Sequence, residues 1–203
     1  FGVPLPSEDA ADAAVRSSIA MISQLRTWNA DRLKADKMPV GMGVGVNTDN
    51  VVTGNIGSSK RMDFTMIGDG VNLAARLEGS CKTYGAQIII SEFTQSKLKG
   101  IYALRELDRI IVKGKTEPVS IFEVLDFHDD ETFPERMDVV GHFTEGLAHY
   151  RGTKFDDAIK SFKAALDANS EDVPSKLYIE RCELFKKSPP PKDWSGEWVM
   201  TEK

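Results

Sequence analysis

Apolar side chains recur at roughly helical spacing in the first part of the chain, between residues 7 and 33. Ser7, followed by two acidic residues, is typical of a helix start, because a hydroxyl can cap the first turn and acids complement its dipole. A charged stretch at 34–37 and then Pro39 mark the end of this segment. The pattern predicts one long helix that packs on a sheet through Ala14, Ile19, Ile22, Leu25, Trp28 and Leu33.

Shorter apolar runs, separated by glycine and polar residues, predict strands in the next part of the chain. Between 40 and 58, glycine alternates with Val, Met and Ile around a polar turn at 48–50, which predicts two strands joined by a tight turn. The run 61–67 enters a Gly-Asp-Gly turn, and an alanine-rich helix continues from it to Tyr84, where a glycine suits the C-cap. The remaining expected elements are strands at 86–90, 101–107, 110–113 and 118–125, and a short helix at 91–98. This alternation predicts an α/β (α+β) domain over 1–127, with a mixed sheet and flanking helices.

A different pattern begins after residue 127. Residues 128–140 are polar and predict a linker, and residues 141–186 carry apolar side chains at helical spacing. The first two helices of this segment are similar to a tetratricopeptide helical pair, with the small residue at Ala158 and the aromatic at Phe162. A third helix is expected at 177–185, and a single repeat should pack on a neighbour. The tail at 187–203 contains three consecutive prolines, and its tryptophans either dock on a folded surface or belong to a disordered end.

Composition narrows the classes of function. Hydrophobic residues make up 41% and charged residues 28% of the 203, as in soluble globular proteins. The net charge of -5, without a basic block, argues against nucleic-acid binding, and no apolar run is long enough for membrane contact by a spanning helix. Cys81 and Cys182 lie far apart without metal-ligand spacing, which indicates reduced thiols and a cytoplasmic location.

The most informative candidate site is the Gly-Asp-Gly turn at 68–70 and the helix that follows it. Glycines let the backbone approach a ligand closely, and a helix start favours anions. Asn72 and Arg76 are four residues apart, so they project from one face of the helix. An amide and a guanidinium in this position suit a ribose and a phosphate. The same spacing is also common on solvated helix surfaces, and spacing alone does not separate the two interpretations.

Three segments carry a more specific signal. Residues 63–77 read Asp-Phe-Thr-Met-Ile-Gly-Asp-Gly-Val-Asn-Leu-Ala-Ala-Arg-Leu. Residues 45–58 read Gly-Val-Asn-Thr-Asp-Asn-Val-Val-Thr-Gly-Asn-Ile-Gly-Ser, and residues 112–119 read Val-Lys-Gly-Lys-Thr-Glu-Pro-Val. In this order and spacing, they resemble the signature, hairpin and lysine loop of class III adenylate/guanylate cyclase catalytic domains. The chain departs from that family at Asp49, where glycine is usual.

The resemblance implies a role for each candidate side chain. Asn72 would orient the ribose and its 3′ oxygen, and Arg76 would stabilise charge on the α-phosphate during the reaction. Lys113 would bind the β- and γ-phosphates, although Lys115 in the same loop could take this role. Thr65 occupies a purine-selecting position, and its hydroxyl can satisfy an adenine edge without excluding guanine. With threonine at this position, the chain also resembles a subclass of the family that includes bicarbonate-responsive adenylate cyclases.

The resemblance also implies cofactors and partners. Such cyclases use Mg²⁺ or Mn²⁺, and the segment at Phe1 resembles the one that follows the second metal-binding aspartate of the family. Both metal aspartates would therefore lie upstream of Phe1, so we expect no metal ligands, no bound ion and no turnover in this segment alone. The expected substrate is ATP, at sites shared between the two chains of a homodimer. The alternatives are a guanylate cyclase, or a non-catalytic cyclase-like module that binds nucleotide or protein.

Overall fold

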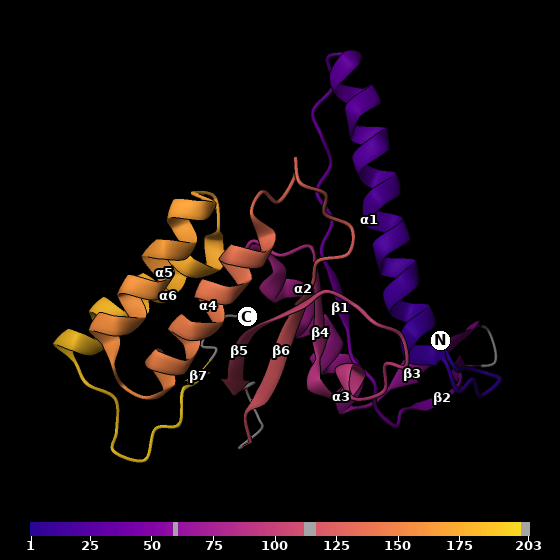
Figure 1. Cartoon of the computed structure of the whole chain (residues 1–203). Coiled ribbons are helices and arrows are strands. Elements are labelled where there is room, and N and C mark those ends of the chain that lie inside the picture. The colour runs from indigo at the N-terminus through magenta and orange to yellow at the C-terminus, as the bar shows by residue number, and fades with distance from the viewer. Residues whose placement is uncertain (59–60, 112–116, 200–203) are drawn as a thin grey trace. The chain divides into compact units, whose positions relative to one another are not determined.

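The computed structural model describes residues 1–58, 61–111 and 117–199 (Figure 1). They form two compact units. Unit 1 comprises Phe1–Lys82, Ala86–Ala103 and Ile121–Phe127, and unit 2 comprises Thr83–Gly85, Leu104–Ser120 and His128–Lys203. The division differs from the boundary that the sequence suggested at residue 127. Part of the cyclase-like segment groups with the C-terminal helices.

A mixed five-stranded sheet confirms the predicted fold class. Its strand order is β1-β4-β6-β5-β7. β1 (Val44–Val46) runs parallel to β4 (Ile88–Ser91), which pairs antiparallel with β6 (Val119–Val124). β5 (Leu104–Ile111) pairs in parallel with β7 (Glu197–Val199). The helices are α1 (Ala10–Lys34), α2 (Asp69–Tyr84), α3 (Glu92–Gln95), α4 (Arg136–Arg151), α5 (Phe155–Ala168) and α6 (Val173–Lys187).

The predicted hairpin between residues 40 and 58 is wrong in its pairing. β1 does not pair with β2 (Val52–Ser58), which forms a separate antiparallel sheet with β3 (Arg61–Ile67). The reason lies in the hydrogen bonds of the polar residues that directly follow β1. Asn47 donates to the Gly70 carbonyl at 3.1 Å, and the Thr48 hydroxyl lies 3.1 Å from that of Thr94. These bonds direct the chain toward α2 and α3, so that it does not turn back along β1.

The long first helix is confirmed, but its cap and its buried face differ from expectation. Its N-cap position is Asp9, and the Ser7 hydroxyl donates to that carboxylate, so it does not cap the backbone. All of its buried side chains lie between Ala11 and Ile22, whereas Trp28 and Leu33 are exposed. The apolar stripe predicted from helical spacing is therefore buried only in its first half.

Three interlocked helices form the core of unit 2 (Figure 1). The Phe143 ring of α4 lies 5.4 Å from Phe162 of α5 and 5.6 Å from Tyr178 of α6. Gly146 is required at this contact, because a Cβ there would meet the Phe162 ring at 2.5 Å. Ala158 is fully buried, as expected for the small position of the helical pair. The resemblance to a tetratricopeptide pair itself stays a prediction.

Two expected boundaries in this region differ in the structure. α4 begins at Arg136, inside the expected linker 128–140, and Val139 is already fully buried. α6 begins at Val173 because Asp172 caps it by accepting from the Ser175 N–H at 3.1 Å, so Pro174 lies in its first turn.

A single strand, β5, runs through the interruption expected between residues 107 and 110, and residues 112–113 of the second expected strand lie outside the described residues. A carboxylate is rare in a buried strand unless it is paired. Asp108 is fully buried, and Arg181 pairs with it at 2.6 Å. The strand continues because this charge is compensated.

The tail docks within unit 2. Trp194 packs 5.0 Å from the Tyr150 ring and donates its indole N–H to the Glu197 carbonyl at 2.8 Å. β7 then aligns with β5, where Ile110 pairs with Trp198. Of the two outcomes left open from the sequence, the segment from Trp194 to Val199 takes the docked one.

Candidate active site

One face of α2 is buried and the opposite face is exposed. The candidate site lies on the exposed face. Leu73, Leu77 and Cys81 lie on the buried face. Asn72 and Arg76 lie together on the exposed face. Among residues 1–58, 61–111 and 117–199, neither side chain makes a hydrogen bond or ion pair. An amide and a permanently charged guanidinium are thus presented side by side, available to an anionic ligand.

A glycine in β1 brings α2 close to the sheet. A Cβ at Gly45 would lie 2.3 Å from the Ala74 carbonyl oxygen and 2.4 Å from the Glu78 nitrogen, both backbone atoms that cannot move aside. On the same side, burial raises the pKa of the Cys81 thiol to about 11. This thiol is neutral at physiological pH, so Cys81 packs against the sheet and is not a nucleophile.

A polar network holds the start of α2. The Gly68 carbonyl accepts from the N–H of Val71 at 3.1 Å. Asn47 donates to the Gly70 carbonyl and accepts from the Ser91 hydroxyl at 2.6 Å. Sequence reasoning missed Asn47 as a positioning residue, although its place inside the hairpin motif was the available signal.

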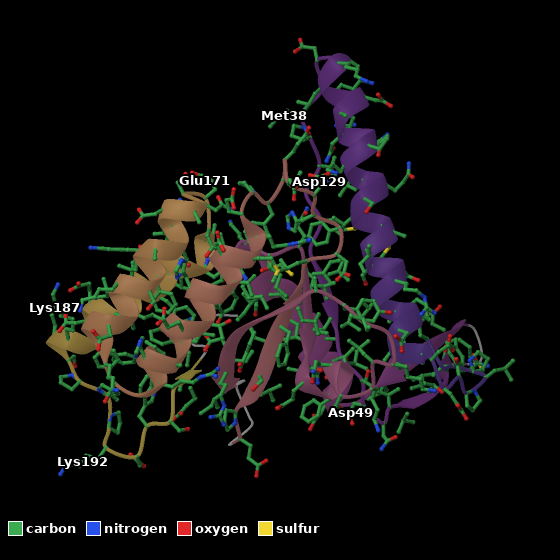
Figure 2. The ribbon with its side chains drawn as sticks, in the orientation of Figure 1. Met38, Asp49, Asp129, Glu171, Lys187 and Lys192 are labelled. Carbon is green, nitrogen blue, oxygen red and sulfur yellow. The ribbon has the colours of Figure 1, made fainter. Side chains whose placement is uncertain are left out.

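Asp49 is accommodated where the cyclase family usually has glycine. It lies in the loop between β1 and β2 (labelled in Figure 2), and its side chain faces Gly70. A Cβ on Gly70 would approach the Asp49 Cβ to 2.4 Å. The Asp49 side chain therefore fits only because residue 70 is a glycine and leaves space for it.

Thr65 lies on β3, paired with Gly54, and is half-buried. Lys113 and Lys115 lie outside the described residues, so their predicted role remains a prediction. No three His, Cys, Asp or Glu side chains in the described part of the chain form a group that could hold a metal. Residues 1–58, 61–111 and 117–199 therefore do not fit a divalent ion site, and we derive no step through a metal.

The β2–β3 sheet exposes an unusual number of apolar side chains. Phe64 is 58% exposed, and this exposed hydrophobic hairpin also includes Val52, Ile56, Met62, Met66 and Ile67. Met62, Phe64 and Met66 alternate along β3 and share one face of this two-stranded sheet, whereas Val52, Ile56 and Ile67 share the other face. Large exposed apolar patches mark interaction sites.

Fold and site together define an α/β domain of the nucleotidyl cyclase type. The family model for the adenylate and guanylate cyclase catalytic domain matches residues 1–125, and the chain belongs to this family. Class III cyclases act on nucleotides, use divalent metal ions and are typically dimeric.

Relatives and solved structures agree with this assignment. The chain is 31% identical over 172 residues to "Adenylate cyclase, terminal-differentiation specific" of Dictyostelium discoideum, covering 83% of this chain and 8% of the relative. It is 38% identical over 120 residues to the adenylate cyclase of Anabaena cylindrica, covering 56% of this chain and 24% of the relative. The chain thus spans a small part of these relatives.

Two solved structures resemble the fold at similar levels. The adenylyl cyclase CyaB from P. aeruginosa is 35% identical with a TM-score of 0.55, covering 64% of this chain and 67% of CyaB. The guanylyl cyclase Cya2 is 36% identical with a TM-score of 0.53, covering 61% of this chain and 62% of Cya2. Among the described residues, no helix has the length and apolar character needed to cross a bilayer.

Proposed function

We propose that this chain supplies the ribose- and phosphate-binding half of an adenylate cyclase site, which converts ATP to 3′,5′-cyclic AMP and pyrophosphate. The observation that carries the proposal is the exposed pair Asn72 and Arg76 on a helix whose opposite face is buried. In the reaction, the 3′ oxygen of ribose loses its proton and bonds to the α-phosphorus, while the bond from that phosphorus to the pyrophosphate oxygen breaks.

Each candidate side chain has a defined task in this scheme. Asn72 hydrogen-bonds the ribose, which aligns the 3′ oxygen with the α-phosphorus. Arg76 neutralises the charge that grows on the phosphate oxygens at the transition state. Thr65 contacts the purine edge, and Lys113 binds the terminal phosphates. Mg²⁺ or Mn²⁺, bound in the complete enzyme by residues other than those described, would lower the charge on the triphosphate.

Steady-state kinetics of the complete protein with ATP and GTP test the proposal. Arg76→Ala should lower kcat by roughly 10²- to 10³-fold, the range for one preorganised charge-stabilising donor, with a smaller change in KM. Lys82→Ala is the matched control, because it removes another exposed cation from the same helix. If Arg76→Ala raised only KM, Arg76 would bind phosphate in the ground state and the assigned role would be wrong.

GTP is the competing substrate, because similarity to CyaB and to Cya2 is about equal. Thr65→Ala should reduce discrimination between the purines while leaving phosphate chemistry in place. A kcat/KM higher for GTP than for ATP in the unmodified protein would reassign it as a guanylate cyclase. A protein that binds nucleotide without turning it over would instead be the non-catalytic module.

We further propose a homodimer with shared sites, supported by the exposed hydrophobic hairpin. Phe64→Glu should shift the complete protein toward monomer in sedimentation experiments and reduce activity in parallel. Phe93→Glu is the control, because Phe93 is a 46% exposed phenylalanine on α3, outside the hairpin. Equal effects of both substitutions would refute this interface. The two free, buried cysteines fit a reducing compartment, and we propose a cytoplasmic location.

A further inference from the structure

Three side chains from distant parts of the sequence meet in the interior of unit 2. Arg181 of α6 donates to the Asp108 carboxylate of β5 at 2.6 Å, and Tyr84 donates its hydroxyl to the same oxygen at 2.6 Å. Arg181 also donates to the Tyr84 hydroxyl oxygen at 3.3 Å. Asp108, Tyr84 and Arg181 are 0%, 1% and 3% exposed. We call these three residues the buried triad.

The protonation states of the triad are set by its surroundings. Burial by itself would lower the pKa of Arg181, but the Asp108 carboxylate outweighs it, so the pKa is raised. Burial raises the pKa of Tyr84, and the Asp108 carboxylate raises it further. The guanidinium therefore stays charged, and the phenol stays a proton donor.

The triad joins α6, one of the C-terminal helices, to α2 and β5, the two elements associated with the candidate site. Tyr84 is the last residue of α2, the helix that presents Asn72 and Arg76. Asp108 lies on β5, which ends at Ile111, directly before the segment 112–116 that contains Lys113. The side chains proposed to bind the ribose and the α-phosphate thus lie on α2. The lysine predicted to bind the terminal phosphates follows β5 in the sequence.

Other contacts between α6 and β5 do not involve α2. Tyr178 donates to the Leu107 carbonyl at 2.9 Å, and Arg105 pairs with Asp172 at the cap of α6. Arg181 alone among these connects α6 to both β5 and the end of α2. The Trp198 ring covers its guanidinium at 4.1 Å, which favours the charged group further.

We propose that Tyr84 is a positioning residue for the cyclase reaction, through which Arg181 and Asp108 of the buried triad hold the end of α2 against α6 and β5. The C-terminal helices then help to fix the position of α2, which carries Asn72 and Arg76. A change in the packing of these helices should therefore alter the position of α2. This inference rests on the proposed function for its catalytic consequence, but the structural coupling can be measured without turnover.

The test compares two tyrosine-to-phenylalanine variants of the complete protein. Tyr84→Phe removes the hydroxyl that joins α2 to the triad, and Tyr178→Phe removes a buried hydroxyl that joins α6 to β5 only. Both keep the ring and lose one hydroxyl, so both should fold. Hydrogen exchange should accelerate in the last two turns of α2 in Tyr84→Phe and remain unchanged there in Tyr178→Phe. Equal protection of α2 in both variants would overturn the proposal.

Kinetics then measure the catalytic consequence. We expect Tyr84→Phe to lower kcat with ATP by about ten-fold, because a misplacement on the order of 1 Å in a reacting group can cost about 10²-fold. KM should change by less than about two-fold, and Tyr178→Phe should keep kcat within about two-fold. Equal kcat values in the two variants would refute the positioning role. If the unmodified protein turns over neither ATP nor GTP, the proposed function fails, whereas the exchange experiment still decides the coupling.

Discussion

Asp108→Asn should destabilise unit 2 strongly, because it leaves a buried guanidinium without a counter-charge. The substitution keeps the size of the side chain and an oxygen that can accept from Tyr84, so the loss is mainly electrostatic. Breaking a buried ion pair by removing one partner costs about 3–5 kcal/mol. This is a large fraction of the roughly 5–15 kcal/mol that stabilises a typical domain.

The assay is urea denaturation followed by tryptophan fluorescence. Trp194 and Trp198 lie in unit 2, so the signal reports mainly on this unit. With a urea dependence of about 2 kcal/mol per molar, the midpoint should fall by about 2 M. The exposed pair of Lys160 with Asp157 provides the control, and Lys160→Met should leave the midpoint unchanged, since surface pairs contribute little.

A second substitution tests whether charge is the cause. In Asp108→Asn with Arg181→Met, no charge is left stranded, so the double variant should be more stable than the sum of the single losses predicts. A coupling of about 1–3 kcal/mol is expected for residues in direct contact. Additive losses, or a single loss below about 1 kcal/mol, would show that Asp108 and Arg181 are not energetically paired.

Three further predictions concern other parts of the chain. Gly146→Ala should destabilise by about 1–3 kcal/mol through overpacking, whereas Gly141→Ala on the same helix, with open space around it, should be neutral or stabilising in thermal unfolding. Backbone hydrogen bonds hold the pKa of Asp12 below its usual range, so the stability advantage of wild type over Asp12→Asn should be fully present above about pH 5 and decline progressively as the pH falls below about 4 in acid titrations; an advantage that stays constant throughout the acid range would contradict this. Burial raises the pKa values of Cys81 and Cys182 to about 11 and about 12, so both thiols should resist alkylation at pH 8 until the protein unfolds, and rapid labelling of the native protein would show that they are accessible.

The division of the chain could not be read from local composition. The polar run after residue 127 suggested a linker, yet Phe133 within it is 5% exposed and the Arg105 guanidinium lies 5.3 Å from its ring. A run of polar residues predicts an exposed segment on average. A single aromatic side chain can nevertheless bury part of that segment when it contacts a residue far away in the sequence.

The sequence by itself determined the candidate site on α2. Its strand, Gly-Asp-Gly turn and helix are adjacent in the chain, so local spacing already places Asn72 and Arg76 on one face. Only the tertiary structure decided that β1 pairs with β4 and that Asp108 continues a buried strand. The partners in these interactions are far apart in sequence, and a carboxylate is tolerated inside a strand only when the fold brings a guanidinium to it.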